Sequence, residues 1–311
     1  MTSAGNGHGM IAVDKMGAKV LFVNPATFAT EKVLDGFQRT VHELLVMPNG
    51  RTAYVPIFGD GIHGRNPNPG HTLCVFGLAR RERLADIDLS PYVAPHTLRL
   101  APDGLIYLTC ENSAVVAIID PRTNKVIGSI PSGSTNGHRL VISPDGTRIY
   151  TDNEEDRTVS VLDLPGRKFL GKIETPQALA GIAISGDGRT VVAVSDETPV
   201  LFLIDTQAGK VARTLPLKDV PKPAQIARYK DDFSLLCVTS LNSNTVSLID
   251  PSFTEQTAIK VGSQPMDMTF RGDDLFIACQ GDGTVHVIDI PARRAKQSFA
   301  AGTGCESLGF F

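Results

Sequence analysis

A short turn sequence recurs along this chain of 311 residues, and its spacing constrains the fold more than any other feature. The intervals between successive turns are 54, 42, 42, 44 and 42 residues. The six turns are Pro48-Asn49-Gly50, Pro102-Asp103-Gly104, Pro144-Asp145-Gly146, Gly186-Asp187-Gly188, Lys230-Asp231-Asp232 and Gly272-Asp273-Asp274. Self-similarity at this period is typical of repeat folds such as propellers and solenoids.

A second marker accompanies the turns: a hydrophobic residue followed by Asp or Asn. It occurs as Val23-Asn24, Ile119-Asp120, Leu162-Asp163, Ile204-Asp205, Ile249-Asp250 and Ile288-Asp289. Between the two markers lie short runs of Val, Ile, Leu and Thr that are separated by turn residues, with few candidate helices. Each repeat is therefore predicted to form four antiparallel strands.

The number of repeats fixes the predicted architecture. Six units are complete, and a seventh is divided between the chain ends, with residues 304–311 as its innermost strand and residues from about 8 to 38 as the other three. Pairing of the two ends closes the ring and removes exposed sheet edges. We expect one all-β domain over residues 1–311, a seven-bladed β-propeller of four-stranded antiparallel blades.

Two segments carry a resemblance to a known family. They are VISPDGTRIYTDNEEDRTVSVLDLPGRKFLGKIETP, residues 141–176, and LAPDGLIYLTCENSAVVAIIDPRTNKVIGSIPSG, residues 100–133. Their order of strand, Pro-Asp-Gly turn, strand and strand-Asp resembles the YVTN-type seven-bladed β-propellers. The resemblance implies the fold but no single activity, because this architecture hosts lactone hydrolases, lyases, oxidoreductase subunits and scaffolds.

Composition sets limits on partners and location. A formal charge of −3 gives no basic excess for nucleic acid, and no apolar run is long enough to span a membrane. The first residues lack the apolar segment of a signal peptide, so we expect a cytoplasmic protein, or a periplasmic one if a leader has been removed. Five cysteines without CxxC spacing are expected to be reduced thiols: Cys74, Cys110, Cys237, Cys279 and Cys305.

Three of the seven histidines occupy the same position in consecutive repeats. His42, His96 and His138 each stand six residues before the proline of a turn, at the predicted start of an innermost strand. The other repeats carry Ala180, Ala224, Met266 and Glu306 at this position. Because innermost strands surround the central channel, the three imidazoles are predicted to converge at its mouth, with Glu306 in the neighbouring blade.

Three imidazoles and a carboxylate form a suitable ligand set for a divalent transition metal ion, whether iron, manganese, zinc, nickel or copper. The alternative is that His42, His96 and His138 form hydrogen bonds with backbone or water in a polar channel. Their recurrence at one repeat position favours the metal. The sequence therefore predicts a metal site of His42, His96, His138 and Glu306.

The first repeat is twelve residues longer than the usual 42, and the excess lies in residues 58–72, FGDGIHGRNPNPGHT. Long connections in compact folds are often functional. Asp60, His63, Arg65 and His71 are predicted to reach over the channel, with His63 as the preferred catalytic base and His71 as a second candidate, because histidine titrates near neutrality. The alternative is a solvated loop.

Acidic residues recur where the second strands end near the same mouth. Glu111, Glu154 and Asp196 are equivalent when the repeats are aligned on Tyr107 and Tyr150. Such carboxylates orient imidazoles or act as acid and base. Glu111 and Glu154 are the preferred catalytic candidates because they share blades with His96 and His138. Two further acidic residues, Asp152 and Glu155, are interpreted as solvated.

Two classes of function fit these patterns. The first is a metal-dependent enzyme that acts on a small-molecule substrate, with hydrolase (lactonase-like) or lyase chemistry favoured because a Lewis-acidic ion polarises a carbonyl or activates water. An iron- or copper-dependent oxygenase or oxidase would use the same ligands. The second class is a non-catalytic propeller scaffold for protein interaction, which has no need of convergent histidines.

Overall fold

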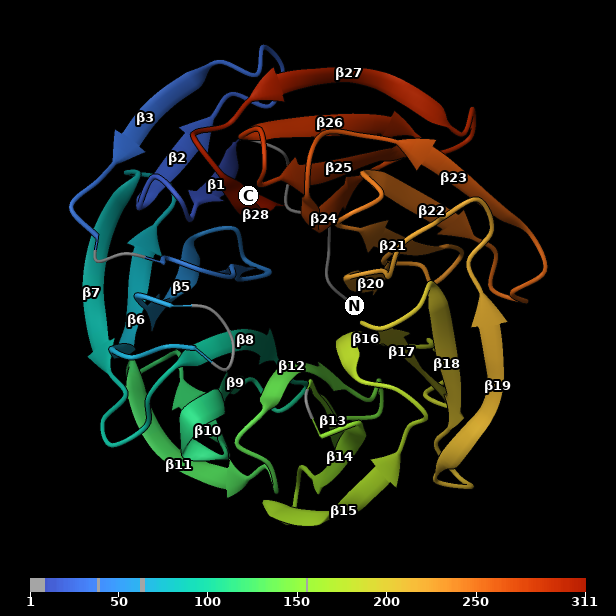
Figure 1. Ribbon diagram of the computed structural model, residues 1–311. Helices are drawn as coiled ribbons and strands as arrows, with labels where there is room; N and C mark the ends of the chain where they lie inside the picture. Colours follow the sequence, from blue (N-terminus) through green and yellow to red (C-terminus); the bar gives the residue numbers. More distant parts are fainter. Residues whose placement is uncertain (1–8, 38–39, 62–64, 155) are drawn as a thin grey trace.

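The computed structural model describes residues 9–37, 40–61, 65–154 and 156–311. They form seven four-stranded antiparallel sheets arranged in a ring, which confirms the predicted seven-bladed propeller (Figure 1). Within these residues the helical content is a single 3-10 turn, η1 (Glu111–Ser113), and no helix is long and apolar enough to cross a membrane.

The blades are numbered 1 to 7 along the chain, and the divided blade is blade 7. Blade 1 contains β4 (Leu45–Val46), β5 (Thr52–Gly59), β6 (Pro69–Gly77) and β7 (Glu82–Asp88). Blade 2 contains β8 (Pro95–Leu100), β9 (Ile106–Cys110), β10 (Val115–Asp120) and β11 (Lys125–Pro131). Blade 3 contains β12 (Gly137–Ile142), β13 (Arg148–Asn153), β14 (Thr158–Asp163) and β15 (Lys168–Glu174).

The remaining blades repeat this pattern. Blade 4 contains β16 (Leu179–Ile184), β17 (Thr190–Ser195), β18 (Val200–Asp205) and β19 (Lys210–Pro216). Blade 5 contains β20 (Ile226–Tyr229), β21 (Leu236–Ser240), β22 (Thr245–Ile249) and β23 (Gln256–Lys260). Blade 6 contains β24 (Pro265–Arg271), β25 (Asp274–Cys279), β26 (Thr284–Asp289) and β27 (Arg294–Ala300). Blade 7 contains β28 (Cys305–Phe310), β1 (Met10–Asp14), β2 (Lys19–Val23) and β3 (Thr30–Leu34).

The ring closes in blade 7, where the sheet order is β28-β1-β2-β3. Met10 pairs with Phe310 at one end of the β28–β1 ladder. Beyond it, the backbone N–H groups of Gly9 and Phe311 each donate to the other residue's carbonyl, at 3.1 and 3.0 Å. Figure 1 shows β28, in red, beside β1, in blue. The two chain ends thus share one sheet.

The apolar core lies between the blades. There are seven clusters of buried hydrophobic side chains, and each contains residues of two neighbouring blades. In the cluster between blades 1 and 2, for example, Tyr54 and Leu73 pack with Leu98 and Leu108. Outermost strands such as β3 are largely exposed. Each innermost strand is therefore held by the blades on both sides, which fixes the side chains that line the channel.

Truncation of Phe311 tests the closure. Phe311 is 8% exposed, and its ring packs edge to face against Phe22 at a centroid distance of 6.1 Å. We expect Phe311→Ala to lower the free energy of unfolding by about 3–5 kcal/mol, as for other buried Phe truncations. The half-exposed Phe169 provides the control, and Phe169→Ala should cost less than about 1 kcal/mol. Equal losses in urea denaturation would contradict this role.

The five cysteines offer a second test of the packing. All five thiols are free and buried, and burial raises the pKa of Cys74, Cys110 and Cys279 to about 12. Because the thiolate is the reactive form, we expect no labelling of the native protein by Ellman's reagent at pH 8. Five thiols should react once guanidinium chloride unfolds the chain. Rapid labelling of the native state would be incompatible with this packing.

Candidate metal centre

The structure brings His42, His96 and His138 together at one mouth of the channel, as the repeat alignment predicted. His96 and His138 are the second residues of β8 and β12, and His42 precedes β4. The ring centroids of His42 and His96 are 4.2 Å apart, and those of His96 and His138 are also 4.2 Å apart. All three side chains are buried. They form a continuous row across blades 1, 2 and 3.

Hydrogen bonds between neighbouring blades hold the backbone of this row. Thr109 of blade 2 donates its hydroxyl to the carbonyl of His138 in blade 3, at 2.8 Å. Ser307 of blade 7 donates its hydroxyl to the carbonyl of His42 in blade 1, at 3.2 Å. The histidines are therefore positioned by the ring as a whole and not by their own blades alone.

A carboxylate faces the Nδ1 atom of each imidazole. The distances from Nδ1 to the carboxylate oxygen are 3.5 Å for His42 and Glu306, 3.6 Å for His96 and Glu43, and 3.4 Å for His138 and Asp152. In a metal-binding histidine, one ring nitrogen binds the ion and the other commonly donates its hydrogen to a carboxylate. This second contact fixes the tautomer and the ring orientation. This leaves Nε2 of His96 and His138 in position to bind an ion, whereas Nε2 of His42 lies 3.1 Å from Nζ of Lys15.

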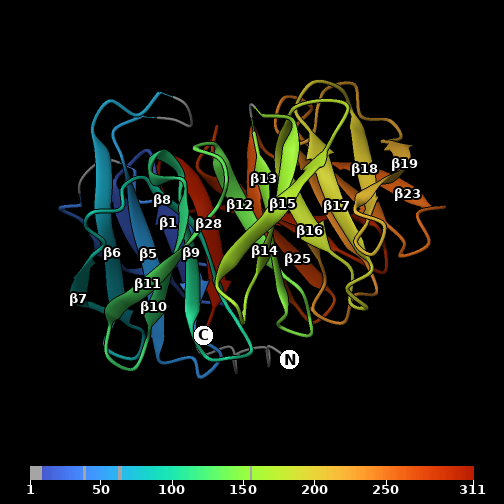
Figure 2. The ribbon, with the colours of Figure 1, turned by 90° about the horizontal axis from the view of Figure 1, so that it is seen from below.

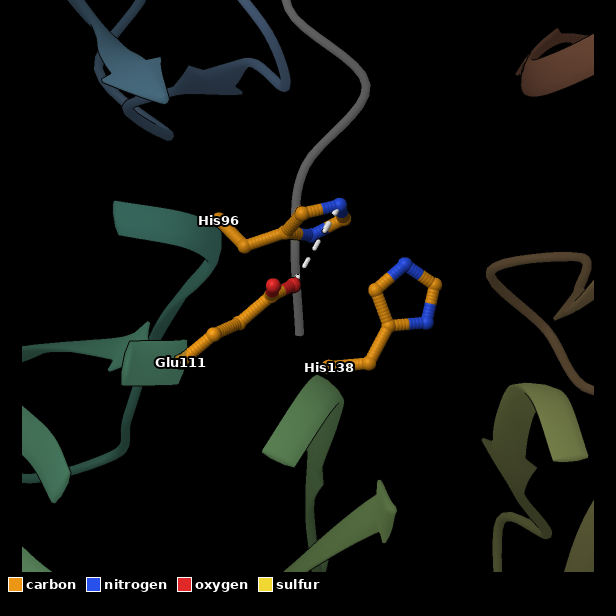
Figure 3. A group of neighbouring side chains, drawn as sticks. All are labelled: His96, Glu111 and His138. Carbon is orange, nitrogen blue, oxygen red and sulfur yellow. Dashed lines mark ion pairs between the residues drawn. The ribbon is translucent and has the colours of Figure 1, made fainter. Parts of the chain in front are cut away.

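Within the described residues, one group of side chains has its ligand atoms close enough together to hold a metal ion. It consists of His96, Glu111 and His138, whose ligand atoms all lie within 4.8 Å of one another (Figure 3). Nε2 of His96 is 3.9 Å from Oε1 of Glu111. Glu111 is buried at the start of η1. The sequence suggested this residue as an acid, a base or an orienting group, and the structure places it among the candidate ligands.

Glu306 faces His42, as predicted, but it has two further neighbours that the sequence did not indicate. Its Oε1 lies 3.5 Å from the ammonium of Lys15, and the amide of Gln280 donates to its other oxygen. The Lys15 Nζ is also 3.1 Å from Nε2 of His42. An ammonium group thus occupies the position between His42 and Glu306 that the predicted four-ligand site would give to the ion. The alignment missed Lys15 because it lies just after β1 and not at the repeat position.

Burial and charge give the imidazoles different protonation states. Burial lowers the pKa of His42 and His96 well below the usual value, and neighbouring cationic groups lower it further. Burial also lowers the pKa of His138, but the Glu154 and Asp152 carboxylates outweigh it and raise that pKa to about 9. At neutral pH and without a bound ion, His42 and His96 are therefore neutral and His138 is protonated.

Asp152 corrects one prediction, since this residue is fully buried and not solvated. The pairing of β12 with β13 shifts register between Gly137 and Leu140, which marks a β-bulge around His138. The bulge leaves the backbone N–H of Arg139 outside the ladder, and Asp152 accepts that hydrogen bond at 2.8 Å. The bulge sets His138 and Arg139 of β12 opposite the single residue Asp152 of β13, which brings the carboxylate to the channel histidine.

Among the described residues of the blade 1 extension, His71 and Asp60 do not line the cavity beside the histidine row. His63 and Glu155 lie outside the described residues. His71 is in β6, its side chain is 54% exposed, and its Nδ1 lies 3.1 Å from Asp88 of the adjacent strand. Asp60 accepts hydrogen bonds from Asn68. Part of the extra sequence lengthens β5 and β6. His71 therefore belongs to the third strand of the blade and does not line the cavity that opens beside the histidine row.

A cavity of about 460 Å³ opens next to the histidine row. Glu154 and Asp196, the other predicted acidic residues, both line it. Lysine and amide side chains that sequence reasoning did not identify add polar groups: Lys15, Gln225, Gln264 and Gln280. A cavity of this size accommodates a small organic molecule. Its polar lining indicates a polar ligand.

Comparison with known proteins identifies the fold and no closer relationship. No protein-family model matches the chain, and no curated protein matches its sequence. A structure of hydrazine synthase from Kuenenia stuttgartiensis is similar over 86% of this chain and 88% of its own, with a TM-score of 0.70 and 18% identity.

Two further structures cover 97% of this chain and 98% of their own. A functionally unknown protein from Desulfotomaculum acetoxidans gives a TM-score of 0.79 at 12% identity. The periplasmic gluconolactonase PpgL from Pseudomonas aeruginosa gives 0.75 at 16% identity. The chain is therefore a seven-bladed β-propeller with the fold of proteins that include enzymes, and membership of the YVTN-type family is not confirmed.

The unusual protonation of His138 is open to direct measurement. We expect NMR of the metal-free protein to show His138 titrating near pH 9, and Asp152→Asn to lower that value because one stabilising carboxylate is lost. Protonated His138 stabilises the fold in full below about pH 6.5, the pKa of this residue in the unfolded chain. This contribution to the free energy of unfolding disappears as the pH rises through about 9. An unchanged titration in Asp152→Asn would contradict the assignment.

Proposed function

We propose that this propeller is a metal-dependent enzyme that acts on a small polar molecule at the channel mouth. The observation that carries the proposal is the row of three buried imidazoles, each with a carboxylate at Nδ1, beside an open cavity. A scaffold has no need of three buried imidazoles that each face a buried carboxylate beside one cavity.

His96, Glu111 and His138 are the proposed ligands. Bonds of about 2.0–2.2 Å place neighbouring ligand atoms about 3–4 Å apart, so atoms that lie within 4.8 Å need only small side-chain movements to close around an ion. Two nitrogens and one oxygen suit zinc, manganese, iron and other divalent transition ions. Three protein ligands leave further coordination positions, as in catalytic sites.

Hydrolysis of a lactone or eliminative C–O cleavage is the favoured chemistry. A bound divalent ion would supply Lewis acidity. Within the cavity Lys15 is placed to attract a negatively charged substrate oxygen, and Glu154 is placed to accept a proton from water or substrate. The likeness in fold to a gluconolactonase supports lactones as the first substrates to assay.

Metal analysis tests the ligand assignment. We expect about one ion per chain in protein purified under metal-replete conditions, measured by mass spectrometry of the dissolved metal. His96→Ala and Glu111→Gln should each reduce the content at least tenfold, because each removes one of three ligands.

Two variants serve as comparisons for that measurement. His71→Ala should retain the ion, because its ring is on an outer strand. Glu306→Gln should also retain it, because Glu306 is engaged by Lys15 and Gln280. Sub-stoichiometric metal in the wild type, or full retention in Glu111→Gln, would refute the proposed site.

The role of Glu154 is tested separately by kinetics. With a panel of sugar lactones, we expect Glu154→Gln to lower kcat by a factor of about 10²–10⁴, the usual contribution of a general base. Its metal content should match that of the wild type. Full activity in Glu154→Gln, or loss of the ion along with activity, would contradict its assignment as the base.

A further inference from the structure

A second cavity, of about 330 Å³, lies at the other end of the channel. Residues near the C-terminal ends of innermost strands line it, including Arg99 of β8 and Arg271 of β24. Figure 2 shows the ring from the side, with the C-terminus at the end opposite the β5–β6 connection. Phe310, next to that terminus, also lines the cavity. We call it the lower cavity.

A layer of buried charges separates the lower cavity from the histidine row. Glu43 pairs with Arg139, and its Oε2 lies 3.7 Å from Nη1 of Arg99. Asp267 pairs with Arg228 at 2.9 Å. The layer thus contains three guanidinium groups and two carboxylates, an excess of one positive charge. Of the three arginines, Arg99 and Arg228 line the lower cavity.

Arg99 retains hydrogen-bonding capacity toward this space. Its Nη1 donates to the carbonyl of Leu98 at 2.9 Å, and its side chain is 30% exposed. Within the described part of the chain, Arg99 contacts Leu98 and Glu43, in both cases through Nη1. The guanidinium carries five N–H donors, so Nε and Nη2 remain to bind an anion in the bidentate manner typical of arginine and carboxylates.

The rest of the lining defines the ligand further. Leu44, Val46, Phe270 and Phe310 give the cavity an apolar wall. Arg271, which lies over the Phe310 ring at 5.3 Å, and Asp231 also line it and offset each other in charge, so the net attraction for an anion comes from Arg99 and Arg228. Cavities of about 300 Å³ and above hold small organic ligands. The lining therefore matches a molecule with one negative charge and an apolar body.

We propose that the lower cavity is a binding site for a small organic monocarboxylate, with the carboxylate on Arg99 and Arg228 and the apolar body against Phe270 and Phe310. This site lies apart from the metal centre, and one side chain faces both. Glu43 Oε1 lies 3.6 Å from Nδ1 of His96, whereas Glu43 Oε2 faces Arg99. A carboxylate bound to Nε and Nη2 of Arg99 would share the guanidinium that Glu43 faces through Nη1.

Calorimetric titration of the full-length protein with hexanoate tests the proposal. We expect hexanoate to bind the wild type and Arg80→Gln with equal affinity, because Arg80 is 84% exposed on an outer hairpin. Arg99→Gln should weaken binding at least tenfold, and Arg99→Lys, which retains charge without the planar fork, should give an intermediate loss. Glu43 keeps its Arg139 partner in both variants. Hexanamide, the neutral analogue, should bind at least tenfold more weakly than hexanoate.

Lys15→Gln distinguishes this site from the cavity beside the histidines, which also contains a cation. We expect this variant to bind hexanoate as the wild type does. Loss of binding in Lys15→Gln with retention in Arg99→Gln would overturn the proposal. It would equally be overturned by equal affinities for hexanoate and hexanamide, or by no binding to the wild type at millimolar hexanoate.

Discussion

The pairing of β28 with β1 is the constraint on which the rest of the structure depends. An open series of blades would leave two sheet edges and one apolar interface without a partner, whereas the closed ring buries all seven interfaces. Closure also assembles the channel mouth. Lys15 follows β1 and Glu306 lies in β28, 291 residues apart in sequence, yet the two side chains meet beside His42 of blade 1. The fold and the candidate site therefore both depend on the pairing of β28 with β1, and weakening that pairing would disturb both.

Sequence reasoning succeeded where the repeat itself carries the information. The period of about 42 residues predicted the blades, and the common position of His42, His96 and His138 predicted their convergence, because equivalent residues of a ring face one axis. It failed where the burial of a side chain depends on the strand that it pairs with. Asp152 looked solvated at a strand end, but it lies opposite the bulge of β12, where it faces the buried His138 and accepts from the N–H of Arg139. Lys15 has no counterpart at the repeat position, so alignment of repeats offers no signal for it.

The buried charges in the channel are costly, and stability does not explain them. Burying an ion pair costs desolvation energy that mutual attraction often fails to recover, so apolar side chains would fill the channel at least as well. Here Glu43 contacts Arg99, which lines the lower cavity, and it also contacts Arg139 and His96, which line the cavity beside the histidine row. One carboxylate thus orients an imidazole of the upper site and neutralises a guanidinium of the lower one. Anion binding below and ion binding above would be coupled through this residue, and such coupling is reciprocal.

The placement of Lys15 bears on how many ions the upper site can hold. Without the lysine, His42 and Glu306 would offer a nitrogen and an oxygen to a second ion next to the first, the arrangement of two-metal sites. The ammonium already supplies a positive charge there, 3.1 Å from His42 Nε2 and 3.5 Å from Glu306 Oε1. The positive charge of Lys15 repels a second ion. The His42 nitrogen and the Glu306 oxygen are also already engaged by the ammonium group. The geometry consequently favours a single ion on His96, Glu111 and His138, with Lys15 as a fixed cation beside it that can attract a substrate anion without becoming a ligand.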